Sequence, residues 1–320
     1  MHIPVLLKES IEILDPKKGK FFIDGTIGGG GHSVEILKKI GVSGKLLGID
    51  WDKDAIERLN PPAGGGKFKN YKNAILSNDN YADLPEILKK LNLLKADGLI
   101  IDLGFSSDQL EKSGRAPNQS KLGTGRGFSF MRNEILDMRY NPTGEDLTAA
   151  EVVNSFSEKE LADIFWKYGE EKYSRQIAKK IIEERKKKRI LTAFELVEII
   201  KKAVPKNYEP RSRTSSLRGR QGRIHPATKV FQALRIYVNY ELDNLEKLLK
   251  NLTAILNSDG RVVIISFHSL EDRLVKNYFR QIVKEGKAEF LARKPIRPSI
   301  EEIKNNPRSR SAKLRAIKIK

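Results

Sequence analysis

The chain has 320 residues, of which 39% are hydrophobic and 32% are charged, and its formal net charge is +19. Apolar side chains in this proportion can form packed cores, which excludes collagen-like, low-complexity and mostly disordered proteins. The absence of cysteine excludes disulfides, thiol catalysis and iron–sulfur clusters. The sequence has no recognisable signal peptide and no apolar stretch of about 18 residues, so we expect a cytoplasmic protein without a membrane partner.

Short apolar runs alternate with helical patterns through the first part of the chain. The runs FFID (21–24), LLGID (46–50) and DGLIIDLG (97–104) predict buried strands, and a weaker strand is expected near 71–76. A segment with helical periodicity follows each of the first three predicted strands. Strands that alternate with helices in this way predict an α/β fold with a parallel, doubly wound sheet covered on both faces.

The alternation stops after the fourth predicted strand. A polar, glycine-rich segment is followed by helical signals as far as Pro205. Capping boxes, in which Ser or Thr is followed three residues later by Glu, mark helix starts at Thr148, Ser157 and Thr192. Beyond a basic loop, the sequence predicts an amphipathic helical stretch (227–256), a strand (261–267), a helix (269–283) and a final strand (313–320).

The simplest architecture is therefore an α/β sheet that is interrupted by a small helical domain. We expect residues 1–110 to form the first part of the sheet domain and residues 224–320 to form its second part. Residues 111–223 are expected to form the inserted, mostly helical domain with its flanking loops. No internal repeat is visible in the sequence.

Positive charge is concentrated in two segments. Residues 175–235 carry 18 basic and 5 acidic side chains, and residues 284–320 carry 12 basic and 4 acidic ones. Lys and Arg side chains bind polyanions favourably because they release counterions from the phosphates. A nucleic acid that contacts the inserted domain is the first interpretation, and a merely solvated surface is the alternative.

The segment DGTIGGGGHS (24–33) joins a predicted strand to a predicted helix. Glycines let backbone N–H groups approach a ligand, and the helix that follows presents its positive end. Asp50, which ends the next predicted strand, is placed to accept hydrogen bonds from two ribose hydroxyls. Both features indicate an adenosine-containing ligand, although glycine-rich turns also occur for structural reasons alone.

The glycine spacing distinguishes between such ligands. Neither register of G-x-G-x-x-G, beginning at Gly25 or at Gly28, fits the dinucleotide pattern. Asp24 opens the turn, which is unfavourable for a pyrophosphate and favourable for a cationic ligand. S-adenosylmethionine carries an ammonium and a sulfonium group, so the sequence favours it over NAD or FAD. The four histidines show no metal-binding spacing, so no metal site is expected.

Eight sequence blocks follow one another in the order found in one protein family and cover nearly the whole chain. Through them the chain resembles the bacterial ribosomal RNA small-subunit methyltransferase H family, also called MraW. The blocks are GGHS (30–33), DLGFSS (102–107), RGFSFM (126–131), LDMR (136–139), YGEE (168–171), HPAT (225–228, with FQALRI after two further residues), SFHSLEDR (266–273) and NPRSRSAKLR (306–315).

The resemblance implies both a fold and an activity. The implied fold is a class I, Rossmann-like S-adenosylmethionine-dependent methyltransferase sheet with an inserted small helical domain. The implied activity is methylation of the N4 amine of a cytidine in the decoding region of 16S ribosomal RNA, so this RNA or the small ribosomal subunit is the expected partner. The cofactor-binding residues implied by motif position are Gly30, Gly31, His32, Asp50, Tyr81, Asp102 and Gln109.

The expected reaction sets requirements on the site. The N4 amine of cytosine is a poor nucleophile because its lone pair is delocalised into the ring. It must be aligned about 3 Å from the methyl group, and an acceptor for its N–H helps the transfer. Asp102, at the end of the fourth predicted strand, is the catalytic candidate, and the alternative is that it only holds the cofactor. His225 and His268 are interpreted as structural residues.

Two other functions stay open at this point. A DNA amino-methyltransferase is one, although the fourth predicted strand ends in DLGF and not in the D/S/N-P-P-Y/F/W tetrad of such enzymes. A ribosome-assembly factor without enzymatic activity is the other, and the intact glycine segment and Asp50 argue against it. Phe128, Phe130 and Phe231 are candidates either for stacking a flipped base or for core packing.

Overall fold

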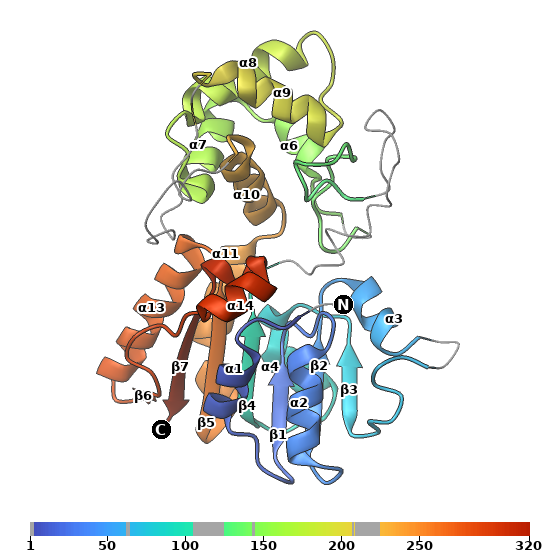
Figure 1. The fold of residues 1–320 in the computed structure, drawn as a ribbon, viewed down its shortest axis with the longest axis vertical. Helices are drawn as coiled ribbons and strands as arrows, with labels where there is room; N and C mark the ends of the chain where they lie inside the picture. The colour runs from blue at the N-terminus through green and yellow to red at the C-terminus, as the bar shows by residue number, and fades with distance from the viewer. Residues whose placement is uncertain (1–2, 62–64, 105–124, 143–144, 207, 209–224) are drawn as a thin grey trace. The chain divides into compact units, whose positions relative to one another are not determined.

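The fold consists of two compact units, which are described separately (Figure 1). The first unit comprises Met1–Gly104 and Leu242–Lys320, and the second comprises Phe105–Glu241. The computed structural model describes residues 3–61, 65–104, 125–142, 145–206, 208 and 225–320.

The first unit is built on a seven-stranded sheet with the strand order β3-β2-β1-β4-β5-β7-β6. The first five strands in this order pair in parallel, whereas β7 runs antiparallel to both β5 and β6. This topology confirms the class I, Rossmann-like methyltransferase sheet. The strands are β1 (Phe21–Asp24), β2 (Lys45–Ile49), β3 (Ala74–Ser77), β4 (Ala96–Asp102), β5 (Leu256–Ser266), β6 (Ala288–Phe290) and β7 (Lys313–Ile319).

Helices cover both faces of this sheet because successive strand residues point to opposite sides. In β1, Phe22 packs with α1 and α2, while Ile23 belongs to the cluster formed with α4 and α11–α13. The helices of this unit are α1 (Leu7–Leu14), α2 (Gly31–Ile40), α3 (Lys53–Leu59), η1 (Tyr81–Asp83), α4 (Leu84–Lys90), α11 (Glu241–Lys250, which begins at the boundary), α12 (Leu252–Ile255), α13 (Ser269–Lys284), α14 (Ile300–Asn305) and η3 (Pro307–Ser311).

The structure adds two details about the later part of the chain that the sequence did not specify. The sheet is not wholly parallel, because the last strand inserts antiparallel between β5 and the short β6. The stretch 227–256 is not one continuous helix. It breaks at Tyr240, which has a left-handed φ of 50°, and its last residue already belongs to β5.

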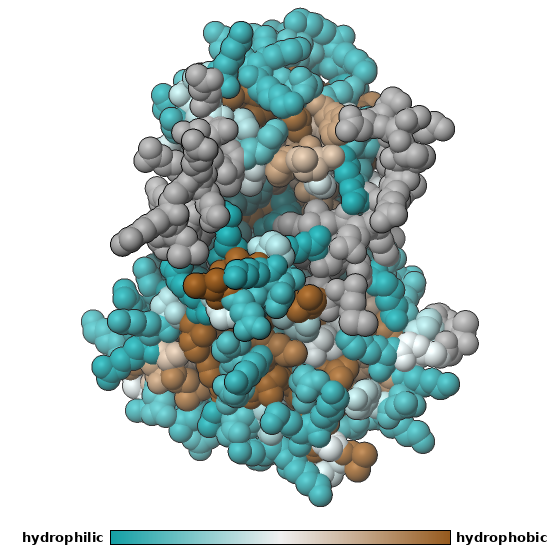
Figure 2. All heavy atoms as spheres, viewed as in Figure 1, coloured by the Kyte–Doolittle hydropathy of each residue, from teal (hydrophilic) through white to brown (hydrophobic). Residues whose placement is uncertain are grey.

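The second unit is a helical bundle with its own core. Three of its helices, α6, α7 and α9, begin where the capping boxes predicted, since Thr148, Ser157 and Thr192 each accept a hydrogen bond from the N–H of the Glu three residues later. Hydrophilic side chains cover the face over α8 and α9 in the view of Figure 2. The helices are α6 (Ala149–Ser155), α7 (Glu158–Gly169), α8 (Ser174–Arg185), α9 (Ala193–Ala203) and α10 (Ala227–Val238).

The boundary after the inserted segment lies further along the chain than the expected position 224. Val230, Phe231 and Leu234 of α10 are buried in the same hydrophobic cluster as residues of α6–α9. Because α10 contributes to that core, the second unit extends to Glu241. Among the described residues, no helix combines the length and the hydrophobicity needed to cross a membrane.

The capping box at Ser157 gives a prediction about stability. Ser157→Ala removes the hydroxyl that accepts from the Glu160 N–H and donates to its carboxylate. We expect the free energy of unfolding to fall by about 1 kcal/mol, measured by urea denaturation. Ser155→Ala is the matched control, because the Ser155 hydroxyl only donates to the Glu151 carbonyl within its own helix. Equal stability of Ser157→Ala and wild type would contradict the prediction.

Candidate functional site

The glycine-rich loop connects β1 to α2 at the carboxyl edge of the sheet. Gly30 caps α2 with a left-handed φ of 69°, and a Cβ there would lie 2.6 Å from a ring carbon of Phe68. At Gly31 a Cβ would lie 2.1 Å from Pro4. Neither position accommodates a larger side chain, so the fold itself requires these two glycines at the start of α2.

Asp24 ends β1 and is held by the turn that follows it. The Ser33 hydroxyl donates to its Oδ2 at 2.6 Å, and the Thr26 N–H donates to its Oδ1 at 3.2 Å. Burial raises the pKa of Asp24 to about 6, the two hydrogen bonds oppose this shift, and the charge of Asp50 adds to it. The turn therefore begins with a buried carboxyl group that lacks a cationic partner among the described residues.

Asp50 follows β2 and connects that strand to the glycine-rich loop. The Gly28 N–H donates to Oδ2 and the Asp52 N–H donates to Oδ1, both at 2.9 Å. Burial raises its pKa to about 6, against the effect of the two hydrogen bonds. Each carboxylate oxygen has a second lone pair, so Asp50 can accept two further hydrogen bonds, as the pair of ribose hydroxyls requires.

Asp102 ends β4, the strand adjacent to β1. Its N–H donates to the Thr26 hydroxyl at 2.7 Å, which fixes the strand end to the loop. Its Oδ1 is buried and accepts no hydrogen bond. The pKa of this carboxyl lies well above its usual range because of burial first, and then because of the charges of Asp24 and Glu271. Asp102 is therefore a buried acceptor with unused capacity.

His32 lies in the first turn of α2 and is buried. Its Nε2 is 3.1 Å from the Val5 carbonyl oxygen, which accepts only if Nε2 carries the proton. Its Nδ1 lies 4.0 Å from Oδ2 of Asp102, too far for a hydrogen bond. The imidazole thus links the segment before α1 to the neighbourhood of Asp102.

Tyr81 approaches the same loop from the segment that follows β3. A Cβ built on Gly25 would lie 3.2 Å from Cβ of Tyr81 and 2.4 Å from Cδ1 of Ile101. The structure therefore brings Gly30, Gly31, His32, Asp50, Tyr81 and Asp102 around one loop at the carboxyl edge of the sheet. Gln109 lies outside the described residues.

Three further residues organise this loop, and they were not among the predicted site residues. Thr26 holds the ends of β1 and β4 together, and Ser33 orients Asp24. The Lys67 ammonium donates to the Gly29 carbonyl at 2.8 Å. Thr26 and Ser33 lie within the glycine-rich motif, so their position was a usable signal. Lys67 lies 38 residues away from Gly29, and nothing in its sequence context indicated the contact.

The two histidines of the matched blocks occupy the starts of helices. In the first unit, His268 caps α13, where its Nδ1 accepts from the Glu271 N–H and its own N–H donates to the Glu271 carboxylate. In the second unit, His225 accepts from the Ala227 N–H and stacks on Phe130, with ring centroids 4.9 Å apart. These contacts agree with the structural interpretation of both residues.

The aromatic candidates of the second unit pack mainly against one another. Phe128 is buried and stacks on Tyr140 at 5.5 Å, and Phe231 is buried edge-on against Phe130 at 5.8 Å. Phe130 is partly buried and contacts both His225 and Phe231. Core packing therefore accounts for Phe128 and Phe231.

Comparison with known proteins gives matches along the whole chain. A family model described as the MraW methylase family matches residues 1–320. Curated relatives named "Ribosomal RNA small subunit methyltransferase H" include those of Dictyoglomus thermophilum (46% identical, covering 98% of this chain and 95% of the relative), Clostridium botulinum strain Loch Maree (44%, covering 99% and 98%) and Syntrophobacter fumaroxidans (39%, covering 99% and 95%). The chain therefore belongs to the MraW methylase family, and it is a methyltransferase whose cofactor is S-adenosylmethionine.

Proposed function

We propose that this protein transfers the methyl group of S-adenosylmethionine to the N4 amine of a cytidine in the decoding region of 16S ribosomal RNA. The names of the relatives support the small-subunit RNA as substrate. The observation that carries the proposal is Asp102, a partly buried carboxyl at the end of β4 whose Oδ1 accepts no hydrogen bond among the described residues. A polar acceptor of this kind suits an amine nucleophile that must lose a proton.

The cofactor is proposed to bind along the carboxyl edge of the sheet. Asp50 accepts hydrogen bonds from the ribose hydroxyls. It does so through the carboxylate lone pairs that the N–H groups of Gly28 and Asp52 do not use. The buried carboxyl of Asp24 favours the positive charges of the methionine part. The backbone of Gly30, Gly31 and His32 contacts the ligand at the start of α2, Tyr81 lies near the adenine, and Asp102 and Gln109 complete the pocket.

In the proposed reaction, bound S-adenosylmethionine supplies the methyl group and its sulfur keeps the electron pair of the broken bond. The N4 atom forms the new bond to carbon, and one N4 proton passes to the carboxylate of Asp102, the base in this step. Asp102 accepts the hydrogen bond from this N–H, which favours a pyramidal nitrogen with a localised lone pair. Its raised pKa makes the carboxylate a stronger base than an ordinary aspartate.

Asp50 provides a prediction about cofactor binding. Asp50→Ala removes the charged acceptor of the ribose hydroxyls, so we expect S-adenosylmethionine affinity to fall about tenfold, or about 1.5 kcal/mol, in calorimetric titration. Asp97→Ala is the matched control, because Asp97 also accepts a backbone hydrogen bond, from Phe21, but at the opposite end of the parallel strands. Equal affinities of Asp50→Ala and wild type would reject Asp50 as the ribose ligand.

The substrate is tested by incubating the purified protein with S-adenosylmethionine and small ribosomal subunits from a strain that lacks this enzyme. We expect one cytidine of the 16S RNA to gain a methyl group, which mass mapping assigns to N4. Free 16S RNA and double-stranded DNA serve as parallel substrates. Methylation of the DNA alone, or of a different base, would overturn the proposed function.

A further inference from the structure

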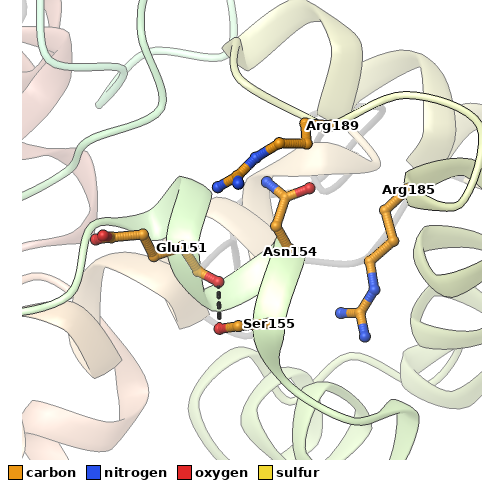
Figure 3. A pocket seen from close by; sticks show the side chains of 5 residues that line it. All are labelled: Glu151, Asn154, Ser155, Arg185 and Arg189. Carbon is orange, nitrogen blue, oxygen red and sulfur yellow. Dashed lines mark hydrogen bonds between the residues drawn. The ribbon is translucent and has the colours of Figure 1, made fainter.

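A pocket on the second unit lies between α6 and the carboxyl end of α8, and none of the candidate site residues lines it. Its volume is about 320 Å³, within the range of small-ligand sites. Figure 3 shows the two arginine side chains projecting from α8 and from the segment after it toward α6. The lining residues are Glu151, Asn154, Ser155, Arg185 and Arg189.

Arg185 is fixed in place by the end of α6. Its Nη1 donates to the carbonyl oxygens of Val153 and Phe156, at 3.0 and 2.6 Å. These carbonyls have no partner within their own helix, so the arginine completes the helix end. Within the described chain, the rest of this guanidinium group makes no hydrogen bond, and a ligand in the pocket meets donors that are already oriented.

Arg189 reaches the same pocket and is exposed. Within the described part of the chain, its guanidinium has no hydrogen-bond or ion-pair partner. Two of the neighbouring lysines differ, because Lys187 pairs with Glu184 at 3.0 Å and Lys188 pairs with Glu195 at 2.7 Å. Lys186 is likewise exposed without an ion pair among the described residues, but it does not line the pocket. The charges at the pocket itself are those of Arg185 and Arg189, opposed by the carboxylate of Glu151.

The other lining groups have already used most of their hydrogen-bonding capacity. The Asn154 amide donates to the carbonyls of Ala150 and Ile190 and accepts from the Ile190 N–H. The Ser155 hydroxyl donates to the Glu151 carbonyl, which is the dashed line in Figure 3.

The Glu151 carboxylate is engaged at the start of α6. It accepts from the N–H and hydroxyl of Thr148, and these bonds, together with the charges of Arg139 and Arg189, lower its pKa. The pocket therefore holds two guanidinium groups and one carboxylate, so its net positive charge and its unused donors suit an anion without donors of its own.

We propose that this pocket binds a phosphodiester group of the RNA substrate. Two guanidinium groups match the planar, paired acceptor geometry of phosphate oxygens better than an ammonium group does. The proposal rests on the proposed function for the identity of the polyanion. Because a phosphate contact carries no base information, the pocket contributes affinity and not sequence selection.

The test uses the full-length protein with Arg189→Ala and Arg189→Lys, and with Lys159→Ala as the matched control. Lys159 is an exposed cation of α7 in the same unit, and it does not line the pocket. Filter binding is measured across a salt series with a 16S RNA fragment and with polyuridylate of the same length. S-adenosylmethionine affinity serves as the folding control, and it should be the same in all variants.

For Arg189→Ala we expect about tenfold weaker binding of both RNAs. The slope of log K against log salt, which is negative, should become less steep by about 0.7. Arg189→Lys should keep the wild-type slope and lose affinity, because the charge stays and the planar donor pair is lost. Lys159→Ala should behave as wild type.

An Arg189→Ala protein with the wild-type slope and affinity would overturn the proposal that this pocket binds a phosphodiester group. Failure of the proposed function looks different. In that case the wild-type protein binds both RNAs without methylating 16S RNA, and the Arg189 variants still decide whether phosphate binds at this site.

Discussion

Asp102→Asn is expected to lower the single-turnover rate of methyl transfer by about 100-fold or more at saturating S-adenosylmethionine, because general-base assistance contributes at least that factor. Asparagine preserves the size of the side chain, and the backbone N–H of residue 102 still donates to Thr26. What changes is the acceptor, since an amide oxygen is a far weaker base than a carboxylate with a raised pKa. We expect cofactor affinity to change by less than tenfold.

Three outcomes of this experiment have different meanings. A rate loss without an equal loss of affinity assigns Asp102 to the amine nucleophile. An affinity that falls in step with the rate means that Asp102 only holds the cofactor. Methyl transfer at the wild-type rate rejects both roles. Asp97→Asn is the control, because it changes a carboxylate at the opposite end of β4 and should leave rate and affinity unchanged.

The elements that the sequence predicted well are those set by local interactions. Each capping box needs only four consecutive residues, and Thr148, Ser157 and Thr192 all start helices in the structure. Strand order depends on contacts between distant segments. The insertion of β7 between β5 and β6 has no local signature, so the sequence could not show that the last strand reverses direction.

The same distinction applies to the candidate site. Asp24, Asp50 and Asp102 were identifiable because each ends a predicted strand, and parallel strands end at one edge of the sheet. The link from His32 to the Val5 carbonyl and the Lys67 contact depend on packing between distant segments. The raised pKa values also required the structure, because burial is their largest cause.

The affinity for S-adenosylmethionine should fall about 100-fold between pH 7 and pH 5. Asp24 and Asp50 both have a pKa of about 6 in the free protein. The ligand favours both carboxylates in their charged form, because its cationic groups attract Asp24 and its ribose hydroxyls donate to Asp50. Below pH 6 the ligand must therefore displace one proton from Asp24 and one from Asp50. Each displaced proton lowers the affinity about tenfold for every pH unit below 6.

Unfolding of the free protein does not explain such a loss. A carboxyl whose pKa is raised by folding, here from 3.8 to about 6, stabilises the folded state most below its unfolded pKa. This contribution is lost as the pH rises through 6. Asp24 and Asp50 therefore make the free protein more stable at pH 5 than at pH 7, and the lost affinity reflects competition between protons and ligand.

Two comparisons separate the contributions of the carboxyls in calorimetric titrations at pH 5, 6 and 7. Adenosine has the ribose but neither cationic group, so its affinity should fall only about tenfold over this range, through Asp50 alone. Asp24→Asn should bind S-adenosylmethionine more weakly at pH 7 and show the same shallow dependence as adenosine. An S-adenosylmethionine affinity that does not change between pH 5 and pH 7 would mean that neither carboxyl changes protonation on binding, and the cationic part of the cofactor would then have to bind away from Asp24.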